Sequence, residues 1–215
     1  MRISRFYGDP YSREISGVRH ILGIGTRPYD EALEAEVGSA SVRFNAVEEL
    51  VARFEDAHSL VGPEDIAARA TLTAQISSVE PKPGDPLYSW GGGAERKIWL
   101  LHAADEVPEI ASEMAAYALA KGEPIFSSLS NTDQALGILS ADDQRSRSYS
   151  GPDEARAMKA IALSFLSHGE AAARQLAKAK LARLKGEDRS KVAKWMDRFF
   201  RAGAMRRPIE LRDTH

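Results

Sequence analysis

Apolar and polar residues alternate along parts of the first half of the chain. The clearest case is the segment 70–76, in which Leu72, Ala74 and Ile76 share one side of an extended backbone. Successive strand side chains point to opposite faces, so this alternation predicts a half-buried strand. Apolar runs predict further strands at 18–24, 40–44 and 96–102. Together these strands should form a small mixed or antiparallel sheet.

Elsewhere the apolar residues recur every three or four positions, which is the period of one helix face. Helices are predicted in this way over 46–61, 107–122 and 131–140, the first of them ended by Gly62-Pro63. Gly122 suits the end of the second helix, and Asn131 or Thr132 suits the cap of the third. Asp30 is a suitable cap for a short helix over 30–37. The segment 123–130 is predicted as a short strand or turn.

A polar, serine-containing stretch that ends in Gly-Pro occupies residues 141–152 and predicts an exposed linker. Beyond it, helical periods cover 153–168, 170–185 and 188–202, with breaks at Gly169 and Gly186. The chain is therefore predicted to be of the α+β class. Its expected parts are an α+β body over 1–140 and a basic helical C-terminal unit over 153–207, joined by the linker 141–152.

The composition narrows the class of protein. The chain has 215 residues, which is enough for a full hydrophobic core, and it has no cysteine. Disulfides, thiolate catalysis and cysteine-based zinc sites are thereby excluded. No apolar run reaches the roughly 18–20 residues of a membrane helix, and no apolar signal segment follows the N-terminus. We expect a cytoplasmic protein that is not attached to a membrane.

The small net charge of -2 hides a strong polarity along the chain. Residues 1–170 contain 16 Lys+Arg against 26 Asp+Glu, whereas residues 171–207 contain 12 against 3. An acidic region followed by a basic one bears on the choice of partners more than on the fold.

No motif predicts a cofactor, a metal site or a catalytic centre. The triple glycine 91–93 runs into an apolar strand instead of a helix, so it predicts a hairpin tip and not a phosphate loop. Gly23-x-Gly25 lacks the third glycine of a dinucleotide site and is predicted to be a strand-to-helix turn. Adjacent acids such as Glu48-Glu49 are interpreted as solvated surface. His102, at a strand end, is the one histidine considered as a base.

The C-terminal helices carry the most distinctive pattern. Over 188–202, four cations lie on one side of the predicted helix, and we call this set the basic stripe: Lys191, Lys194, Arg198 and Arg201. A second stripe is apolar and should be buried, because burying charge costs far more: Val192, Trp195, Met196 and Phe199. In the preceding helix, three further cations are candidate binding residues: Arg174, Lys178 and Lys185.

This basic surface admits three interpretations: a solvated helix face, a site for an acidic protein partner, and a site for the backbone of a nucleic acid. The chain shows neither a helix-turn-helix nor an aromatic RNA-binding signature, and a membrane surface is disfavoured by the acidic body. We predict a non-enzymatic interaction or regulatory protein that docks an acidic partner through its basic C-terminal helical face. The alternative is a nucleic-acid-associated protein that uses the same helices for backbone contacts. No family is indicated by these motifs.

Overall fold

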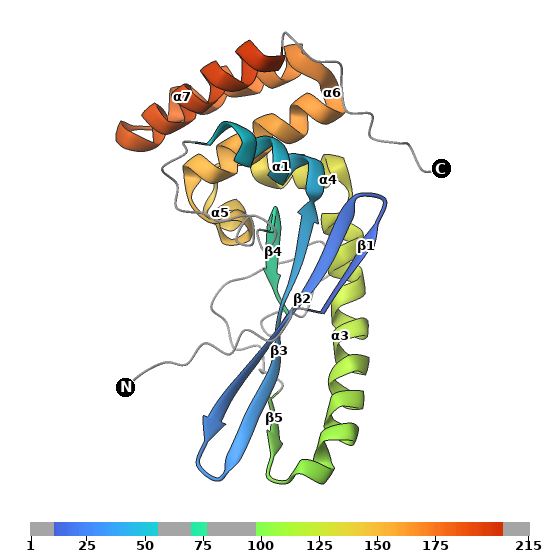
Figure 1. Cartoon of the computed structure of the whole chain (residues 1–215). Coiled ribbons are helices and arrows are strands. Elements are labelled where there is room, and N and C mark those ends of the chain that lie inside the picture. Colours follow the sequence, from blue (N-terminus) through green and yellow to red (C-terminus); the bar gives the residue numbers. More distant parts are fainter. Residues whose placement is uncertain (1–10, 56–69, 77–97, 204–215) are drawn as a thin grey trace.

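The chain folds as an α+β protein, as the sequence predicts. Figure 1 shows the computed structural model, which describes residues 11–55, 70–76 and 98–203. The predicted end of the first helix, at Gly62-Pro63, lies outside these residues. A five-stranded antiparallel sheet comes first along the chain, and a mostly helical region follows it. The strands are β1 (Tyr11–Ile15), β2 (Val18–Tyr29), β3 (Ala32–Phe44), β4 (Leu72–Gln75) and β5 (Ile98–Leu101).

The sheet is organised around the long strand β3. β1, β2, β3 and β4 are neighbours in that order, and β5 pairs with the other half of β3. The registers Val42↔Leu72 and Ala35↔Trp99 show that β4 and β5 pair with successive stretches of this one strand. The predicted strand at 70–76 is therefore present, in a slightly shorter form.

The predicted helix over 30–37 is wrong, because this segment forms the turn and the start of a β-hairpin. β2 and β3 are joined by Asp30 and Glu31, and Asp30 adopts a φ of 47°. A two-residue hairpin turn favours such left-handed conformations. Ala35 and Val37 are buried on one side of β3, which is the alternation of a strand.

The helices are α1 (Asn45–Phe54), α3 (Val107–Leu129), α4 (Thr132–Ser140), α5 (Gln144–Ser150), α6 (Asp153–Arg183) and α7 (Gly186–Gly203), with a short 3-10 turn at Ala104–Glu106. In Figure 1, α3 runs along the sheet, and the other helices gather beyond the end of β3. The side chain of Asn131 caps α4 by accepting a hydrogen bond from the backbone nitrogen of Gln134, at 3.0 Å. Within residues 11–55, 70–76 and 98–203, no helix is both long enough and apolar enough to cross a bilayer.

The predicted strand or turn at 123–130 is also wrong, because α3 continues through it. Gly122 does not end the helix but lies where the helix meets the sheet. A Cβ atom added there would be 3.3 Å from Phe126 and 3.4 Å from Leu22 of β2. The missing side chain thus permits close packing between α3 and β2, and Pro124 is accommodated inside the helix.

The predicted exposed linker at 141–152 contains the helix α5. The Asp143 side chain caps this helix by accepting a hydrogen bond from the backbone nitrogen of Ser146, at 2.7 Å. Tyr149 is only 3% exposed, and α5 contacts β4. The segment has a polar composition because its solvent-facing residues are polar, whereas the ring of Tyr149 joins the core.

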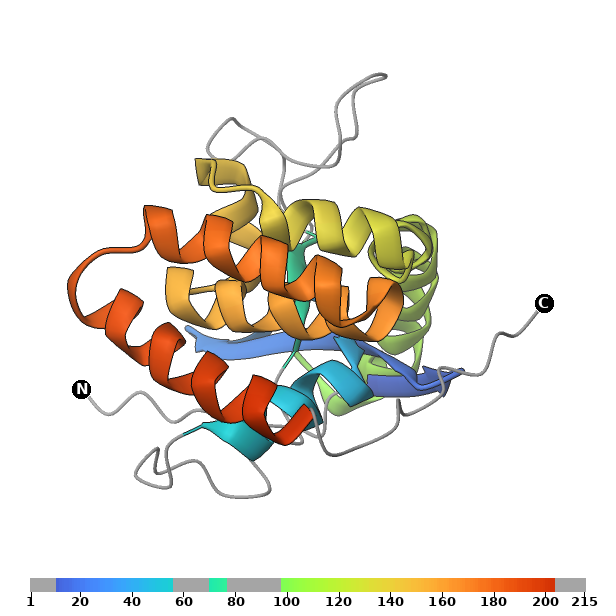
Figure 2. The ribbon, with the colours of Figure 1, turned by 90° about the horizontal axis from the view of Figure 1, so that it is seen from above.

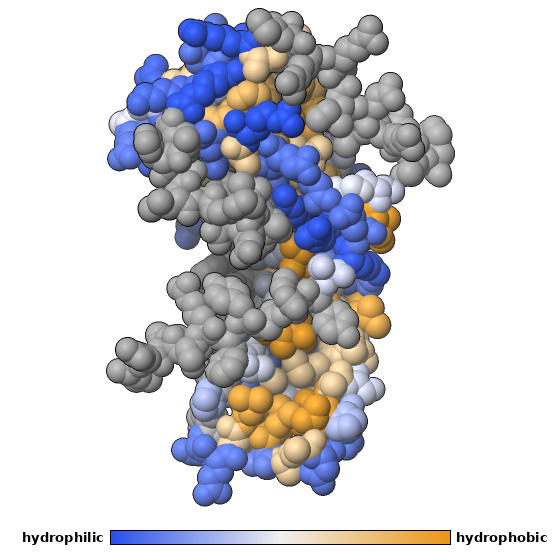
Figure 3. All heavy atoms as spheres, viewed as in Figure 1, coloured by the Kyte–Doolittle hydropathy of each residue, from blue (hydrophilic) through white to orange (hydrophobic). Residues whose placement is uncertain are grey.

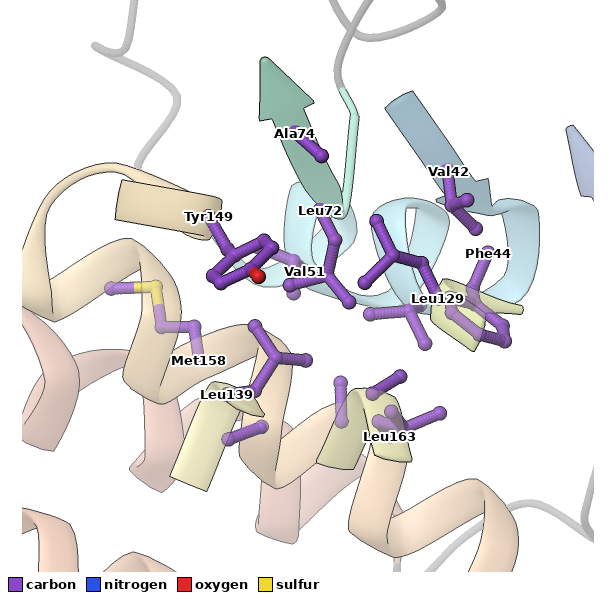
Figure 4. Close-up of a cluster of buried hydrophobic side chains, with 14 of the residues drawn as sticks. Val42, Phe44, Val51, Leu72, Ala74, Leu129, Leu139, Tyr149, Met158 and Leu163 are labelled. Atoms are coloured by element: carbon purple, nitrogen blue, oxygen red, sulfur yellow. The ribbon is translucent and has the colours of Figure 1, made fainter. Parts of the chain in front are cut away.

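One hydrophobic core spans the sheet and the helices. Figure 4 shows side chains from β3, β4, α1, α3, α4, α5 and α6 that meet in it. The labelled members are Val42, Phe44, Leu72, Ala74, Val51, Leu129, Leu139, Tyr149, Met158 and Leu163. The two predicted regions, 1–140 and 153–207, share this core, and their division into separate folding units stays a prediction.

The C-terminal helices follow the predicted breaks. Gly169 interrupts α6 with a φ of 83°, and the chain changes direction there, as Figure 2 shows. A second positive φ, 53°, occurs at Gly186, where α7 begins. α7 then packs against both α6 and α1.

Candidate docking surface on the C-terminal helices

The basic stripe of α7 lies on the solvent side of the helix. Lys191, Lys194 and Arg201 are exposed, and Arg198 is partly buried. The apolar stripe faces inward, with Val192, Trp195 and Phe199 at most 2% exposed and Met196 at the margin of the core. The helix-face assignment made from the sequence is therefore correct.

Most of the stripe's cations already have partners within the molecule. Lys191 pairs with Glu187 at 3.0 Å, and Arg201 with Asp197 at 2.9 Å. The hydrogen bond from Lys191 to Glu187 raises the pKa of the lysine.

Arg198 serves the fold as well as the surface. Its Nη1 donates to the carbonyl oxygen of Phe54, at the end of α1, at 3.2 Å. Next to it, the Trp195 indole donates to the carbonyl oxygen of Val51 at 3.1 Å. These two bonds satisfy carbonyls in the last turn of α1, which have no partner inside their own helix. The stripe thus borders α1 and stabilises its end.

A second surface lies on another side of α7, between this helix and the last part of α6. It is an open groove of about 410 Å³. Its lining combines three cations with an apolar floor: Arg174, Lys178 and Arg189, and Leu181, Ala182, Met196 and Phe200. Figure 3 shows hydrophilic side chains gathered over the upper end of the molecule, where α6 and α7 lie, with apolar atoms among them.

Arg174 is held in place at the rim of this groove. Its guanidinium carbon lies 4.2 Å from the centre of the Phe200 ring, which is a cation–π contact. Its Nη2 is 2.6 Å from the carboxylate of Glu170, one helical turn earlier. Arg174 is therefore oriented over the floor but already compensated in charge.

Lys178 and Arg189 differ from Arg174 in this respect. Both are exposed, and no acidic residue among those that the structure describes forms an ion pair with either of them. One comes from α6 and the other from α7, so each side of the groove has a cation without an acidic partner among the described residues.

Six of the seven predicted binding residues thus fall on two surfaces. Arg174 and Lys178 line the groove, while the four stripe residues lie on a different face of α7. Lys185 is exposed near the connection between the helices and does not line the groove. Arg189 was missed, although it precedes Met196 by seven residues and so shares a helix face with it.

Lys180 of α6 is buried, and its side chain anchors the helix to the residues that precede α5. Its Nζ lies 2.6 Å from Oδ1 of Asp142 and 2.7 Å from the carbonyl oxygen of Ser140. Burial lowers the pKa of Lys180, against the opposing effect of Asp142. Burial alone would raise the pKa of Asp142, but hydrogen bonds from Lys180 and Arg183 bring it below its usual value. This cluster fixes the groove helix α6 to the α4–α5 connection.

One pair outside this surface resembles a nucleophile and its base by distance alone. Ser130 Oγ lies 2.8 Å from Nε2 of His20, and Nε of Arg13 donates to Nδ1 of the same ring at 3.2 Å. Arginine can only donate, so Nδ1 must accept, and the ring proton of the neutral imidazole lies on Nε2. His20 then donates to Ser130 and has no lone pair left to take the serine proton. The pair is a structural hydrogen bond.

His102, the histidine considered as a base, is exposed at the far end of the sheet. It lines an open depression of about 650 Å³ with Asp30, Glu31, Ala32 and Leu100. Among the described residues, no group of three or more potential metal ligands occurs, here or elsewhere. Among the described residues that line this depression, none carries a hydroxyl or thiol group that could act as a nucleophile beside the imidazole.

The interpretation of the adjacent acids as solvated surface, made for nearly all of them, does not hold for Glu48. This residue is fully buried, with one carboxylate oxygen 3.2 Å from Lys159 Nζ and 2.8 Å from the hydroxyl of Thr71. The sequence does not distinguish a buried acid from a surface acid here, because Glu48 and its neighbour Glu49 are both glutamates and only Glu48 faces the core.

No protein-family model, no curated protein and no solved structure matches the chain.

Proposed function

We propose that the protein is a non-enzymatic interaction or regulatory protein, which docks an acidic partner protein through the basic face of α6 and α7. The observation that carries this proposal is the groove, because it combines an apolar floor with two cations that form no ion pair within the described part of the chain. Protein interfaces typically bury an apolar centre and surround it with polar and charged groups. We also propose a cytoplasmic location, because a sequence without cysteine is compatible with a reducing compartment.

The same features argue against the nucleic-acid alternative. Binding to a phosphate backbone gains its free energy from cations that release counterions. In the stripe, Lys191 and Arg201 already have carboxylate partners. An apolar floor has no matching surface on a phosphate backbone. We therefore favour a protein partner, and the experiment below distinguishes it from a nucleic acid.

Photochemical cross-linking in living cells tests the proposal. A photoreactive amino acid is placed at Ala182, which is exposed in the groove, or at Lys194, which is exposed on the stripe. We expect a discrete protein adduct whose cross-linked segment is rich in Asp and Glu. The adduct formed from Ala182 should be lost in the variant Lys178→Gln/Arg189→Gln/Lys194→Gln, because these three cations have no acidic partner among the described residues.

The control removes an equal number of cations elsewhere: Arg19→Gln/Arg53→Gln/Lys121→Gln, on β2, α1 and α3. This variant should keep the adduct. Adducts with nucleic acid that depend on the three C-terminal cations would support the alternative, and an absence of any specific adduct from both positions would refute docking through this face.

A further inference from the structure

We propose that the groove between α6 and α7 binds one amphipathic acidic helix of a partner protein. Apolar residues of that helix would pack on Met196 and Phe200, and its carboxylates would pair with Lys178 and Arg189. This inference rests on the proposed function and specifies the site, the shape and the chemistry of the partner.

The spacing of the lining residues indicates a helix as the occupant. On α6 they lie at Arg174, Lys178, Leu181 and Ala182, which are positions i, i+4, i+7 and i+8. On α7 they are spaced by seven and four residues: Arg189, Met196 and Phe200. Each set forms one face of its helix, so the groove follows both helix axes. A helix that lies in such a groove completes a three-helix arrangement.

The size and openness of the groove favour a protein segment over a small molecule. Eight residues of α6 separate its first and last lining positions, which corresponds to about 12 Å or roughly two helical turns. Small-molecule sites commonly bury about 70–90% of their ligand, whereas this groove is open. Leu181 and Met196, both partly exposed, supply the accessible apolar surface of the floor, and Phe200, only 6% exposed, lies at its bottom.

The distribution of charge indicates the sign and the pattern of the partner. Lys178 on one wall and Arg189 on the other lack an acidic partner among the described residues. Between them the floor is apolar. A helix with an apolar stripe flanked by Glu or Asp complements this arrangement, because each wall then receives a carboxylate.

Glu170 supplies an internal competitor for the partner. Its carboxylate accepts from Nε of Arg174 at 2.7 Å, while the guanidinium stacks on Phe200. Arg174 is thereby held in an orientation that suits a carboxylate arriving above the floor. A partner carboxylate that reaches Arg174 must replace Glu170, so Glu170 weakens binding.

Selection from a displayed library of randomised peptides of about 16 residues, roughly four helical turns, tests the chemistry without knowledge of the partner. The full-length protein serves as bait, and binders that also bind the Lys178→Gln/Arg189→Gln variant are removed. We expect enriched sequences to carry apolar residues at helical spacing with Asp or Glu beside them. Enrichment of sequences that lack acidic residues would overturn the inference.

The enriched peptide is then synthesised with a fluorescent label, and its dissociation constant is measured by anisotropy. We expect Lys178→Gln/Arg189→Gln to weaken binding about tenfold or more. Glu170→Gln should strengthen it about two- to fivefold, as expected for removal of an exposed competing ion pair. The variant Lys191→Gln/Lys194→Gln removes the same charge from the stripe and should change affinity less than about twofold.

Equal effects of the groove and stripe variants would show unspecific attraction and overturn the groove assignment. Tighter, groove-dependent binding of a duplex DNA probe would overturn it in favour of nucleic acid. If the cellular adduct forms from Lys194 but the groove variants have no effect on it, the proposed function stands and this inference fails. If neither position yields an adduct, the proposed function itself fails.

Discussion

Lys159 and Glu48 form an ion pair inside the core, where α6 meets α1. The glutamate is fully buried, and the lysine also donates to the carbonyl oxygen of Ala70 at 2.6 Å. A buried pair contributes little net stability, since both charges lose their hydration. Removing one member is different, because the other charge stays buried without a counter-charge.

We therefore expect Lys159→Met to lower the free energy of unfolding by about 3–5 kcal/mol. The double variant Glu48→Leu/Lys159→Met should be less destabilised than this single variant, because no isolated charge remains. Urea unfolding followed by circular dichroism measures both values. A double variant whose loss equals or exceeds the loss of the single one would contradict a buried charged pair.

His20 is the second residue for which burial has a measurable consequence. It stacks on Phe126 with ring centres 4.5 Å apart. Burial, and then the charge of Arg13, lower the pKa of His20 from its ordinary value of 6.5. Below pH 6.5, the imidazole of His20 binds a proton more readily in the unfolded chain than in the folded protein. His20 therefore lowers the free energy of unfolding as the pH decreases from 6.5 toward the lowered pKa.

The expected outcome is a decrease in urea midpoint between pH 7.5 and pH 5 that is smaller in His20→Gln than in the wild type. The pKa of Asp142 is lowered from 3.8, so the stabilisation that this carboxylate provides is lost only below that pH, outside the range of the experiment. The difference between the two titrations isolates the histidine. Identical pH profiles for the two proteins would refute this role for His20.

At the scale of elements, the break in α6 depends on one backbone conformation. Gly169 has a φ of 83°, which is strained for any residue with a side chain. The space around it is open, so conformation and not contact decides the effect of a substitution.

We expect Gly169→Ala to destabilise the protein by about 1–3 kcal/mol. Gly137 is the matched control, because it lies inside α4, has no neighbouring atom within 4 Å of an added Cβ and has no positive φ. Gly137→Ala should raise stability by about 0.5–1 kcal/mol. Thermal unfolding of the two variants gives the comparison, and a change of the same sign in both would be inconsistent with the observed break.

The elements that the sequence predicted well have an unmistakable period and clear ends. The strand around Leu72 alternates, and α7 shows its apolar stripe because Trp195 and Phe199 are four residues apart. The hairpin was missed because Leu33 and Val37 fit a helix as well as a strand. The length of α3 was missed because Gly122 was interpreted as a stop, although its role is close packing against β2.

The candidate site could be predicted only in part, for a physical reason. Periodicity within a single helix identifies which cations face solvent, and so it identified the stripe and Arg174 with Lys178. The groove arises from the packing of two helices, and its third cation, Arg189, belongs to it only through the position of α7 beside α6. The neutralisation of Arg174 by Glu170 is likewise a property of side-chain conformation.

At the scale of the whole molecule, one core joins the sheet to the C-terminal helices, so the basic helices are firmly placed with respect to the acidic remainder. Anchors at Lys180 and Trp195 tie α6 and α7 to α4–α5 and to α1. A partner that docks in the groove would therefore meet a surface with little freedom to rearrange.

The position of the basic helices at one end of an elongated molecule has a further consequence (Figure 1). Residues 171–203 hold 10 Lys+Arg and 3 Asp+Glu, whereas the described residues before them, 11–55, 70–76 and 98–170, hold 10 and 19, so the described part of the protein is a permanent electric dipole. An anionic body that approaches by diffusion feels this field before contact and turns the protein end-on toward itself. Salt shortens the reach of the field to about 8–10 Å at physiological strength, so it slows the encounter far more than it hastens departure.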